Sequence, residues 1–227
     1  MRALFWDLYA FAYNSVGKLS VHKKLVREVF LSLNVESDRI YLDAGCGTGS
    51  LLLKISRDGK ARAYGIDFSV PMLKQAIRNC RKEKVTLVYS DLSKRLPFND
   101  EFFDGIACVH MLYLLDNPSF TLQEFHRVLK KGSKLVLVNP SIAVSKKSLL
   151  DREYMYADGL IYLTNLPSCS ILALMNILMF RRITLRKTSF IPEETLESLL
   201  KQLSFEILEV KSVYEDTSNL ILVKRLP

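Results

Sequence analysis

Three alternating glycines, Gly45, Gly47 and Gly49, constrain the fold of this chain more than any other feature. An apolar run at residues 39–42 precedes them, and residues 50–55 have the pattern of a helix start. Glycine adopts positive φ in a tight turn and, because it lacks a Cβ, lets a ligand approach the backbone closely. The N–H groups of the following helix suit a carboxylate or a phosphate. We therefore predict a ligand-binding loop between a strand and a helix.

The spacing of these glycines separates two classes of cofactor site. Dinucleotide sites use G-x-G-x-x-G, but Ser50 stands where that pattern requires its last glycine, and the spacing here is G-x-G-x-G. With an aspartate two residues before the first glycine, the loop resembles the first motif of class I methyltransferases that use S-adenosylmethionine (SAM). The resemblance implies cofactor contacts for Asp43, Gly45, Cys46, Gly47 and Gly49.

A second apolar run ends in Asp67, where a carboxylate at the tip of a strand can accept both hydrogen bonds of a ribose diol. Residues 65–73 read G-I-D-F-S-V-P-M-L and match the family phrase G-x-D-x-S-x-x-M-L at each fixed position. Ser69 and Pro71 favour a helix start. The resemblance implies cofactor contacts for Asp67, Phe68 and Met72.

Three further phrases follow in the family's order. Residues 85–92 form an expected strand that ends in Ser-Asp-Leu, where the family binds adenine, which implies roles for Asp91 and Leu92. Residues 96–104 resemble L-P-F-x-D-x-x-F-D, and residues 124–135 resemble E-x-x-R-V-L-K-P-G-G-x-L. In the last phrase Lys131 and Ser133 replace the usual proline and glycine, which affects an expected turn. The combination most resembles methyltransferases of ubiquinone and menaquinone biosynthesis.

Strands alternate with helices along the first 140 residues, which predicts an α/β fold with parallel strands and ligands at their carboxyl ends. The resemblance implies a Rossmann-like, seven-stranded, mostly parallel sheet with helices on both faces. A length of 227 residues with 49% hydrophobic residues fits one domain. Its expected parts are an N-terminal helical cap (1–35), a SAM-binding core (36–140), a helical cover (141–190) and a C-terminal helix with strands (191–227).

The expected chemistry is a positioning task, because SAM already carries a cationic leaving group. For a hydroxyl or activated carbon acceptor, a base helps. His110, at the end of the fourth strand, is the candidate, since an ordinary histidine pKa suits that role. A histidine satisfied by nearby backbone is the equal alternative, and Tyr113 and Asp116 are weaker candidates. Val109, on the same strand, is an expected cofactor contact.

The opening at residues 6–14 resembles the W-D-x-x-A-x-x-Y-D phrase of related methyltransferases, whose aromatic residues fold over the cofactor. Tyr13 is therefore an expected contact for the methionine end of SAM. An equally good interpretation is that Tyr13 and the neighbouring aromatic residues pack an N-terminal helix on the sheet. The same segment lacks the apolar run and cleavage site of a signal peptide, so we do not expect export.

The expected cover is unusually apolar and basic. Residues 159–180 contain no charged residue, and the seven basic and three acidic residues of 141–190 supply half of the net charge of +8. A turn at residues 164–168 leaves 171–180 as an apolar helix, which is shorter than a membrane span. We favour a hydrophobic lid over peripheral membrane contact through residues 159–182. The basic flanks suit anionic lipid, an acidic substrate or RNA.

The remaining features narrow the function. The four cysteines show neither metal-ligand spacing nor a disulfide framework, which favours a reducing, cytoplasmic location. Asn139 and Pro140 follow the fifth strand without the aromatic residue of nucleic-acid amino methyltransferases, so no specific nucleic acid is expected. We predict methyl transfer from SAM, with S-adenosylhomocysteine (SAH) as product, to a small, hydrophobic or quinone-like acceptor. The alternatives are a non-catalytic SAM-binding module, an RNA methyltransferase and, least favoured, an NAD-dependent dehydrogenase.

Overall fold

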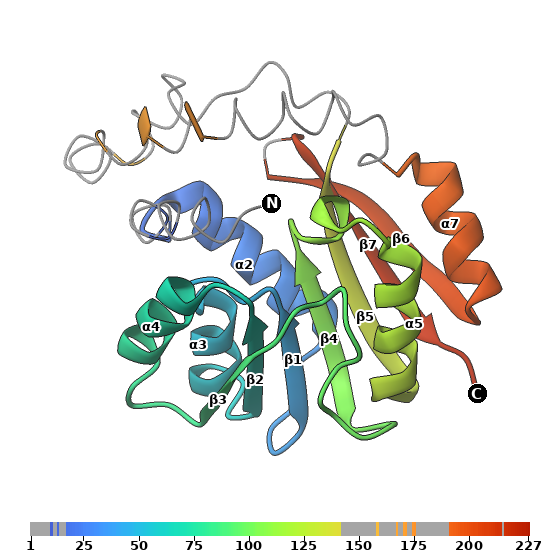
Figure 1. Ribbon diagram of the computed structural model, residues 1–227, viewed down its shortest axis with the longest axis horizontal. Coiled ribbons are helices and arrows are strands. Elements are labelled where there is room, and N and C mark those ends of the chain that lie inside the picture. The colour runs from blue at the N-terminus through green and yellow to red at the C-terminus, as the bar shows by residue number, and fades with distance from the viewer. Residues whose placement is uncertain are drawn as a thin grey trace.

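The computed structural model describes residues 10, 13, 17–141, 158, 167, 170, 171, 174, 175, 191–214 and 216–227. These residues form a seven-stranded sheet of order β3-β2-β1-β4-β5-β7-β6 (Figure 1). The strands are β1 (Ile40–Ala44), β2 (Arg62–Asp67), β3 (Val85–Tyr89), β4 (Phe103–Val109), β5 (Leu129–Pro140), β6 (Phe205–Val213) and β7 (Ser218–Arg225). The first five strands pair in parallel, and β7 runs antiparallel between β5 and β6. The expected mostly parallel, seven-stranded sheet is confirmed.

Helices cover both faces of the sheet (Figure 1). They are α2 (Ser20–Leu33), α3 (Ser50–Arg57), α4 (Val70–Asn79), α5 (Pro118–Val128) and α7 (Glu193–Gln202), with a short 3-10 turn η1 (Leu112–Leu114). The α4 start agrees with the sequence, because the Ser69 hydroxyl accepts the Met72 N–H at 3.4 Å and Pro71 occupies the first turn. In α5, Asn117 caps the helix by accepting the Phe120 N–H at 3.1 Å.

Alternate side chains of the central strands build two cores. On one face Leu42, Ile106 and Leu137 pack with residues of α5 and α7. On the other face Tyr41 and Val138 pack with residues of α2 and α3. Burial of each large apolar side chain contributes about 1.5–3 kcal/mol. The near-continuous apolar strands are therefore explained by a sheet that is covered on both sides.

Two of the family phrases form one structural unit. From α5, Glu124 accepts the Leu96 N–H at 2.7 Å, and Arg127 donates to the carbonyl oxygens of Leu96 and Phe98 at 3.1 and 2.8 Å. Glu124 and Arg127 also pair with each other at 2.7 Å. The segment that leads into β4 is thus held by the helix that follows it.

The turn expected around Lys131 and Ser133 lies inside β5. That strand begins at Leu129, and its pairing with β4 shifts register between Phe103 and Gly105. Between these two pairs β5 contains more residues than β4, and Gly132, with a φ of 75°, lies among them. The additional residues form an irregularity of the strand. The departures from the family pattern therefore lie at the opposite end of β5 from the glycine loop.

The expected cover and the beginning of the expected N-terminal cap fall largely outside the described residues. The described positions of the cover are Ser141, Asp158 and residues 167, 170, 171, 174 and 175. The lid and membrane-contact hypotheses for residues 159–182 therefore stay predictions. In the part of the chain that the structure describes, none of the helices has both the length and the apolar character needed to cross a membrane.

Candidate functional site

The glycine loop connects β1 to α3 at the carboxyl edge of the sheet, where the strand order reverses between β1 and β4. Gly45, Gly47 and Gly49 have φ values of 80°, 51° and 84°, the left-handed conformation for which glycine is suited. The N–H groups of Gly45 and Cys46 both donate to the Ile66 carbonyl, at 2.8 and 3.0 Å. The loop is thereby fastened to the end of β2.

Asp67, at the end of β2, helps to shape this loop. Its two carboxylate oxygens accept the N–H groups of Gly47 and Ser69 at 2.9 and 2.8 Å. Burial raises the pKa of Asp67, and the backbone N–H groups oppose that rise. Each carboxylate oxygen can accept more than one hydrogen bond, so the expected contact with a ribose diol is compatible with both backbone bonds.

Asp43 lies near the end of β1 and is 4% exposed. Burial, and next the charge of Asp67, raise its pKa to about 7. Ionisation of Asp43 is therefore costly in the ligand-free protein, and a cation bound beside it would lower that pKa. A site with two buried carboxylates beside an open backbone loop fits a cationic ligand that also carries hydroxyl groups.

Tyr13, the expected contact for the methionine end of SAM, lies close to Gly47 of the loop. A Cβ placed on Gly47 would lie 3.6 Å from Tyr13 Cε1 and 3.9 Å from Met72 Sδ. Burial, followed by the charges of Asp43 and Asp67, raises the pKa of Tyr13 to about 12. The Tyr13 hydroxyl is therefore protonated at neutral pH.

Met111 is a neighbour of the loop that the sequence analysis missed. A Cβ on Gly45 would lie only 2.2 Å from Met111 Cγ, so the absence of a side chain at Gly45 makes room for this methionine. Met111 follows the end of β4 directly, beside His110. Nothing in its local sequence marks it, since methionine in this position also suits an ordinary core contact.

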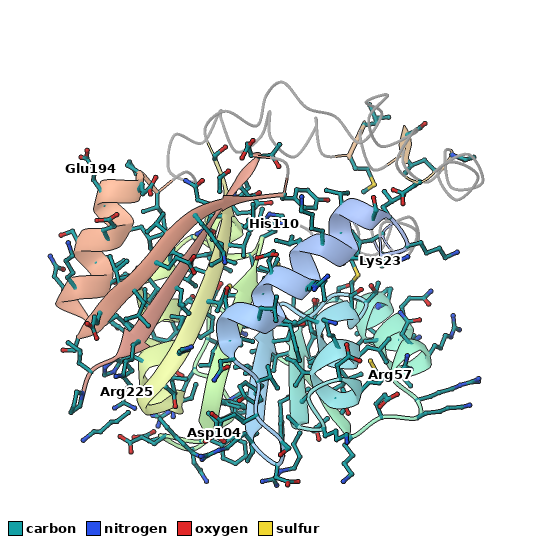
Figure 2. The ribbon with its side chains drawn as sticks, turned by 180° about the vertical axis from the view of Figure 1, so that it is seen from behind. Lys23, Arg57, Asp104, His110, Glu194 and Arg225 are labelled. Carbon is teal, nitrogen blue, oxygen red and sulfur yellow. The ribbon has the colours of Figure 1, made fainter. Side chains whose placement is uncertain are left out.

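His110 stands at the carboxyl end of β4, near the start of α2 (Figure 2). Its backbone N–H donates to the Val138 carbonyl at 2.8 Å, and its ring Nε2 lies 2.9 Å from the Ser218 hydroxyl. Burial first, and then His22, lower the pKa of His110 to about 4. The near-neutral pKa expected from the sequence is therefore wrong, because the ring is desolvated. At pH 7 the imidazole is neutral.

The other expected contacts lie along the same edge or next to it. Asp91 follows β3 and accepts the Ser93 N–H at 2.9 Å, while Leu92 beside it is buried. Phe68 follows the end of β2, and Val109 is the last residue of β4. Both are partly buried. Burial raises the pKa of the Cys46 thiol well above its usual range, so this cysteine is a small core residue. Burial also raises the pKa of Tyr113, which weakens it as a proton carrier at neutral pH.

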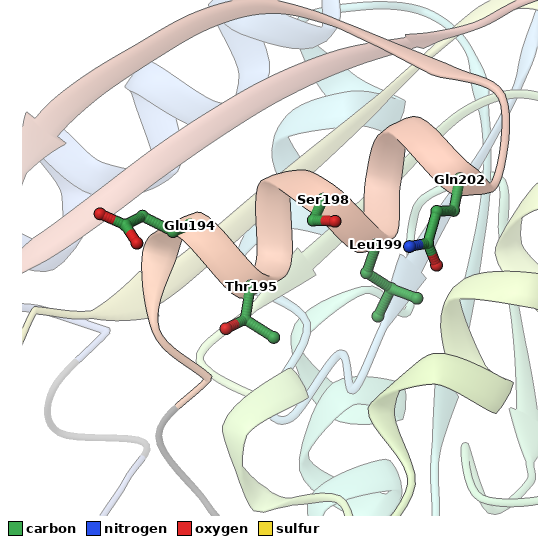
Figure 3. A pocket seen from close by; sticks show the side chains of 5 residues that line it. All are labelled: Glu194, Thr195, Ser198, Leu199 and Gln202. Atoms are coloured by element: carbon green, nitrogen blue, oxygen red, sulfur yellow. The ribbon is translucent and has the colours of Figure 1, made fainter.

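A separate hollow of about 400 Å³ runs along α7 (Figure 3). Its lining residues are Glu194, Thr195, Ser198, Leu199 and Gln202. The helix packs beside β6, at the far side of the sheet from β1 (Figure 1). With Glu194 as the one titratable side chain in its lining, this hollow does not compete with the glycine loop as a site.

Residues 42–137 match the family model described as a methyltransferase domain. This part of the chain is similar to methyltransferase domains. The match begins at the last residues of β1 and ends in β5, so it covers the glycine loop, Asp67, Asp91 and His110. The family and the fold class expected from the sequence are confirmed.

Two curated relatives have sequences similar to this domain. The demethylmenaquinone methyltransferase of Lactiplantibacillus plantarum is 29% identical over 133 residues, which cover 56% of each chain. The 2-phytyl-1,4-naphtoquinone methyltransferase of Nostoc punctiforme is 34% identical over 110 residues, covering 46% of this chain and 47% of the relative. The chain therefore spans about half the length of the curated relatives it matches.

Among solved structures, the magnesium protoporphyrin IX methyltransferase of Synechocystis with bound SAH has the same fold. The TM-score is 0.62 at 18% identity, and the match covers 92% of this chain and 84% of the other. The likeness to a structure with bound SAH agrees with the fold that the strand order defines.

Proposed function

We propose that this chain is a SAM-dependent methyltransferase whose acceptor is a small, hydrophobic, quinone-like molecule. The observation that carries the proposal is the pairing of the glycine loop with two buried carboxylates. Asp43 has a pKa raised to about 7 and is 4% exposed, so the site favours a cation. Gly45 and Gly47 have no side chains of their own, and Met111, Tyr13 and Met72 lie next to them. A sulfonium ligand with an amino-acid end and a ribose matches these features.

Different residues would bind different parts of the cofactor. Asp67 would bind the ribose hydroxyls while it holds Gly47, and Asp91 with the Leu92 amide would bind adenine. Asp43 and Tyr13 would contact the amino-acid end. When bound, SAM supplies a methyl group whose bond to sulfur breaks as the acceptor's electron pair bonds to the methyl carbon, leaving neutral SAH. The chain's own task is to orient the two partners and exclude water, for which alignment is worth about 7–11 kcal/mol in intramolecular reactions.

His110 is the candidate for taking a proton from the acceptor. Its imidazole is neutral at pH 7, and in the tautomer whose Nε2–H donates to the Ser218 hydroxyl, Nδ1 is the nitrogen that accepts a hydrogen bond. The pKa of about 4 makes it a weak base, which suits an acidic ring hydroxyl better than an alcohol. His110→Ala should keep SAH affinity and slow turnover, and a wild-type rate would remove it from this role.

The acceptor class rests on the curated relatives and on the apolar cover. The relatives are named for demethylmenaquinone and 2-phytyl-1,4-naphtoquinone, which are hydrophobic ring systems. Residues 159–180, in the cover, contain no charged residue. We also infer a cytoplasmic location, which is supported by the buried, unpaired thiols of Cys46, Cys80 and Cys108.

Calorimetric titration of the purified chain with SAH and SAM, with NAD as control, tests the cofactor. Binding of both sulfur ligands without NAD is expected, and binding of NAD alone would contradict the proposal. The acceptor is then tested with radiolabelled SAM and 2-phytyl-1,4-naphthoquinol kept reduced in detergent micelles. If SAH binds but neither this compound nor related phenols and quinols accept the label, the chain is a non-catalytic SAM-binding module or uses another acceptor class.

A further inference from the structure

His22 is a buried histidine whose ring has an unused polar atom. It lies in the first turn of α2, is 7% exposed, and its Nε2 has no hydrogen-bond partner in the described part of the chain. Buried polar atoms in folded proteins are nearly always paired, so an exception at the edge of a ligand site requires an explanation. The family resemblance assigns no role to this position, and no local sequence pattern marks it.

The neighbours of His22 place it at the reacting end of the site. Its ring meets the Tyr13 ring edge-on, with 6.0 Å between the centroids. Tyr13 in turn lies over Gly47 of the glycine loop. On another side, His22 acts electrostatically on His110, at the end of β4. His22 is therefore separated by one side chain, Tyr13, from the loop that would hold SAM, and it is near enough to interact electrostatically with His110 at the strand end next to which the acceptor is expected.

The chemistry of this environment favours a neutral partner. Burial lowers the pKa of His22 to about 4, so the imidazole carries no charge at pH 7. Among the described residues, its titratable neighbours include Tyr13 and His110, both uncharged at that pH. A carboxylate ligand would be held better by a cation, whereas the lone pair of a neutral imidazole nitrogen accepts a hydrogen bond from a hydroxyl.

We propose that Nε2 of His22 accepts a hydrogen bond from a ring hydroxyl of the methyl acceptor, a phenol or a reduced quinone. The inference rests on the proposed methyltransferase function and adds the residue that orients the acceptor. A hydrophobic acceptor offers few polar atoms, and a pocket fixes the orientation of such a molecule with a small number of polar contacts. The hydrogen bond would also increase electron density on the hydroxyl oxygen and the adjacent ring carbon, either of which can attack a methyl group.

The chain provides a matched control in His126. Its Nε2 is also without a partner, but it lies on α5 and contacts Phe205, on the other face of the sheet. The test compares His22→Leu, which removes the polar atom, with His22→Gln, which keeps a hydrogen-bonding group near the position of Nε2. His126→Leu reports what loss of an unpaired histidine does to the fold alone.

Two measurements are made on each variant and on the wild type. Calorimetry gives the SAH affinity, and labelled SAM with 2-phytyl-1,4-naphthoquinol in micelles gives KM and kcat. For His22→Leu we expect SAH affinity within about twofold of wild type and KM raised about tenfold, the effect of one lost neutral hydrogen bond. In His22→Gln, KM should lie between the values of His22→Leu and wild type. His126→Leu should change neither SAH affinity nor KM.

The outcomes separate this inference from the proposed function. Wild-type KM in His22→Leu, or in His22→Phe if the leucine variant does not fold, would overturn the role of His22. A loss of SAH affinity in His22→Leu would make His22 a cofactor residue instead. If wild type binds SAH but neither binds nor methylates the naphthoquinol, the ring-hydroxyl assignment fails while the cofactor assignment stands. Failure of wild type to bind SAH would remove the proposed function itself.

Discussion

The Asp67 carboxylate connects the glycine loop to the start of α4, through Gly47 at 2.9 Å and Ser69 at 2.8 Å. Asparagine has one side-chain oxygen, so Asp67→Asn leaves one of these N–H groups facing an amide NH2. We expect SAH affinity to fall by about 1–3 kcal/mol, from the loss of charge-assisted bonds to the ribose and of loop shape. Calorimetry measures the change in SAH affinity, and Asp100→Asn serves as a control at an exposed aspartate. Unchanged affinity would remove Asp67 from the ribose role.

Asp43 gives cofactor binding a pH dependence. With a pKa raised to about 7, it is mostly protonated at pH 6 and mostly ionised at pH 8. Only the ionised form attracts the SAM cation, so the affinity should rise about tenfold across that interval. Titrations at several pH values should show this slope in wild type and a flatter one in Asp43→Asn. A slope of the opposite sign would mean that Asp43 does not face the cation.

In the ligand-free protein, the raised pKa of Asp43 should make the free energy of unfolding fall as pH rises, whereas cofactor affinity rises. Between the unfolded pKa, near 4, and the folded pKa of about 7, the native state holds a proton on Asp43 that the unfolded chain releases. Asp43 therefore lowers stability as pH rises through this window. His22 and His110, with lowered pKa values, act in the other direction below pH 6.5. The difference between wild type and Asp43→Asn in denaturant titrations isolates the contribution of Asp43.

At the scale of elements, the glycine loop combines two separate requirements, backbone conformation and space. Gly45→Ala imposes both costs, because φ is 80° and the new Cβ would lie 2.2 Å from Met111 Cγ. Gly132→Ala imposes only the conformational cost, since φ is 75° and, among the described residues, the new Cβ would meet nothing within 4 Å. We expect a loss of about 1 kcal/mol at Gly132 and about 2–4 kcal/mol at Gly45.

The double variant Gly45→Ala with Met111→Ala separates these contributions. Removing the methionine side chain should recover the steric part of the loss at Gly45 and leave the backbone part. Denaturant titrations of the two single variants and the double variant measure the coupling. Additive effects would show that Met111 already moves freely away from the loop.

The elements that the sequence predicted correctly are those set by local patterns. The glycine loop, the Ser69 cap of α4 and the strand that ends in Asp67 each depend on residues a few positions apart. What could not be predicted depends on packing between distant segments. His22 precedes the loop by more than 20 residues, and its burial results from how α2 lies against the sheet. The lowered pKa of His110 likewise results from burial, which a motif does not report.

At the scale of the molecule, the stabilising contacts of Asp104 and the proposed ligand site lie at opposite ends of the sheet. Figure 2 shows His110 at one end and Asp104 at the other. Asp104 lies in β4 and His110 follows its last residue, six residues further along, which is about 20 Å at roughly 3.3 Å per residue. At its end, Asp104 accepts the Ile40 N–H at 2.9 Å and the Lys130 ammonium at 2.8 Å. It therefore joins the beginnings of β1, β4 and β5.

Asp104→Asn should consequently lower stability without changing cofactor binding. We expect a loss of about 1–3 kcal/mol at pH 7, since the bond to Lys130 loses its charge. Hydrogen bonds from Lys130 and the Ile40 N–H lower the pKa of Asp104 against the opposing effect of burial. Its contribution is present above the unfolded pKa, near 4, and is lost as pH falls through the lower folded pKa. Denaturant titrations at pH 7 and pH 3 should show the variant and wild type converging at acid pH. SAH affinity at pH 7 should match wild type, and a tenfold loss would show that the two ends of the sheet are coupled.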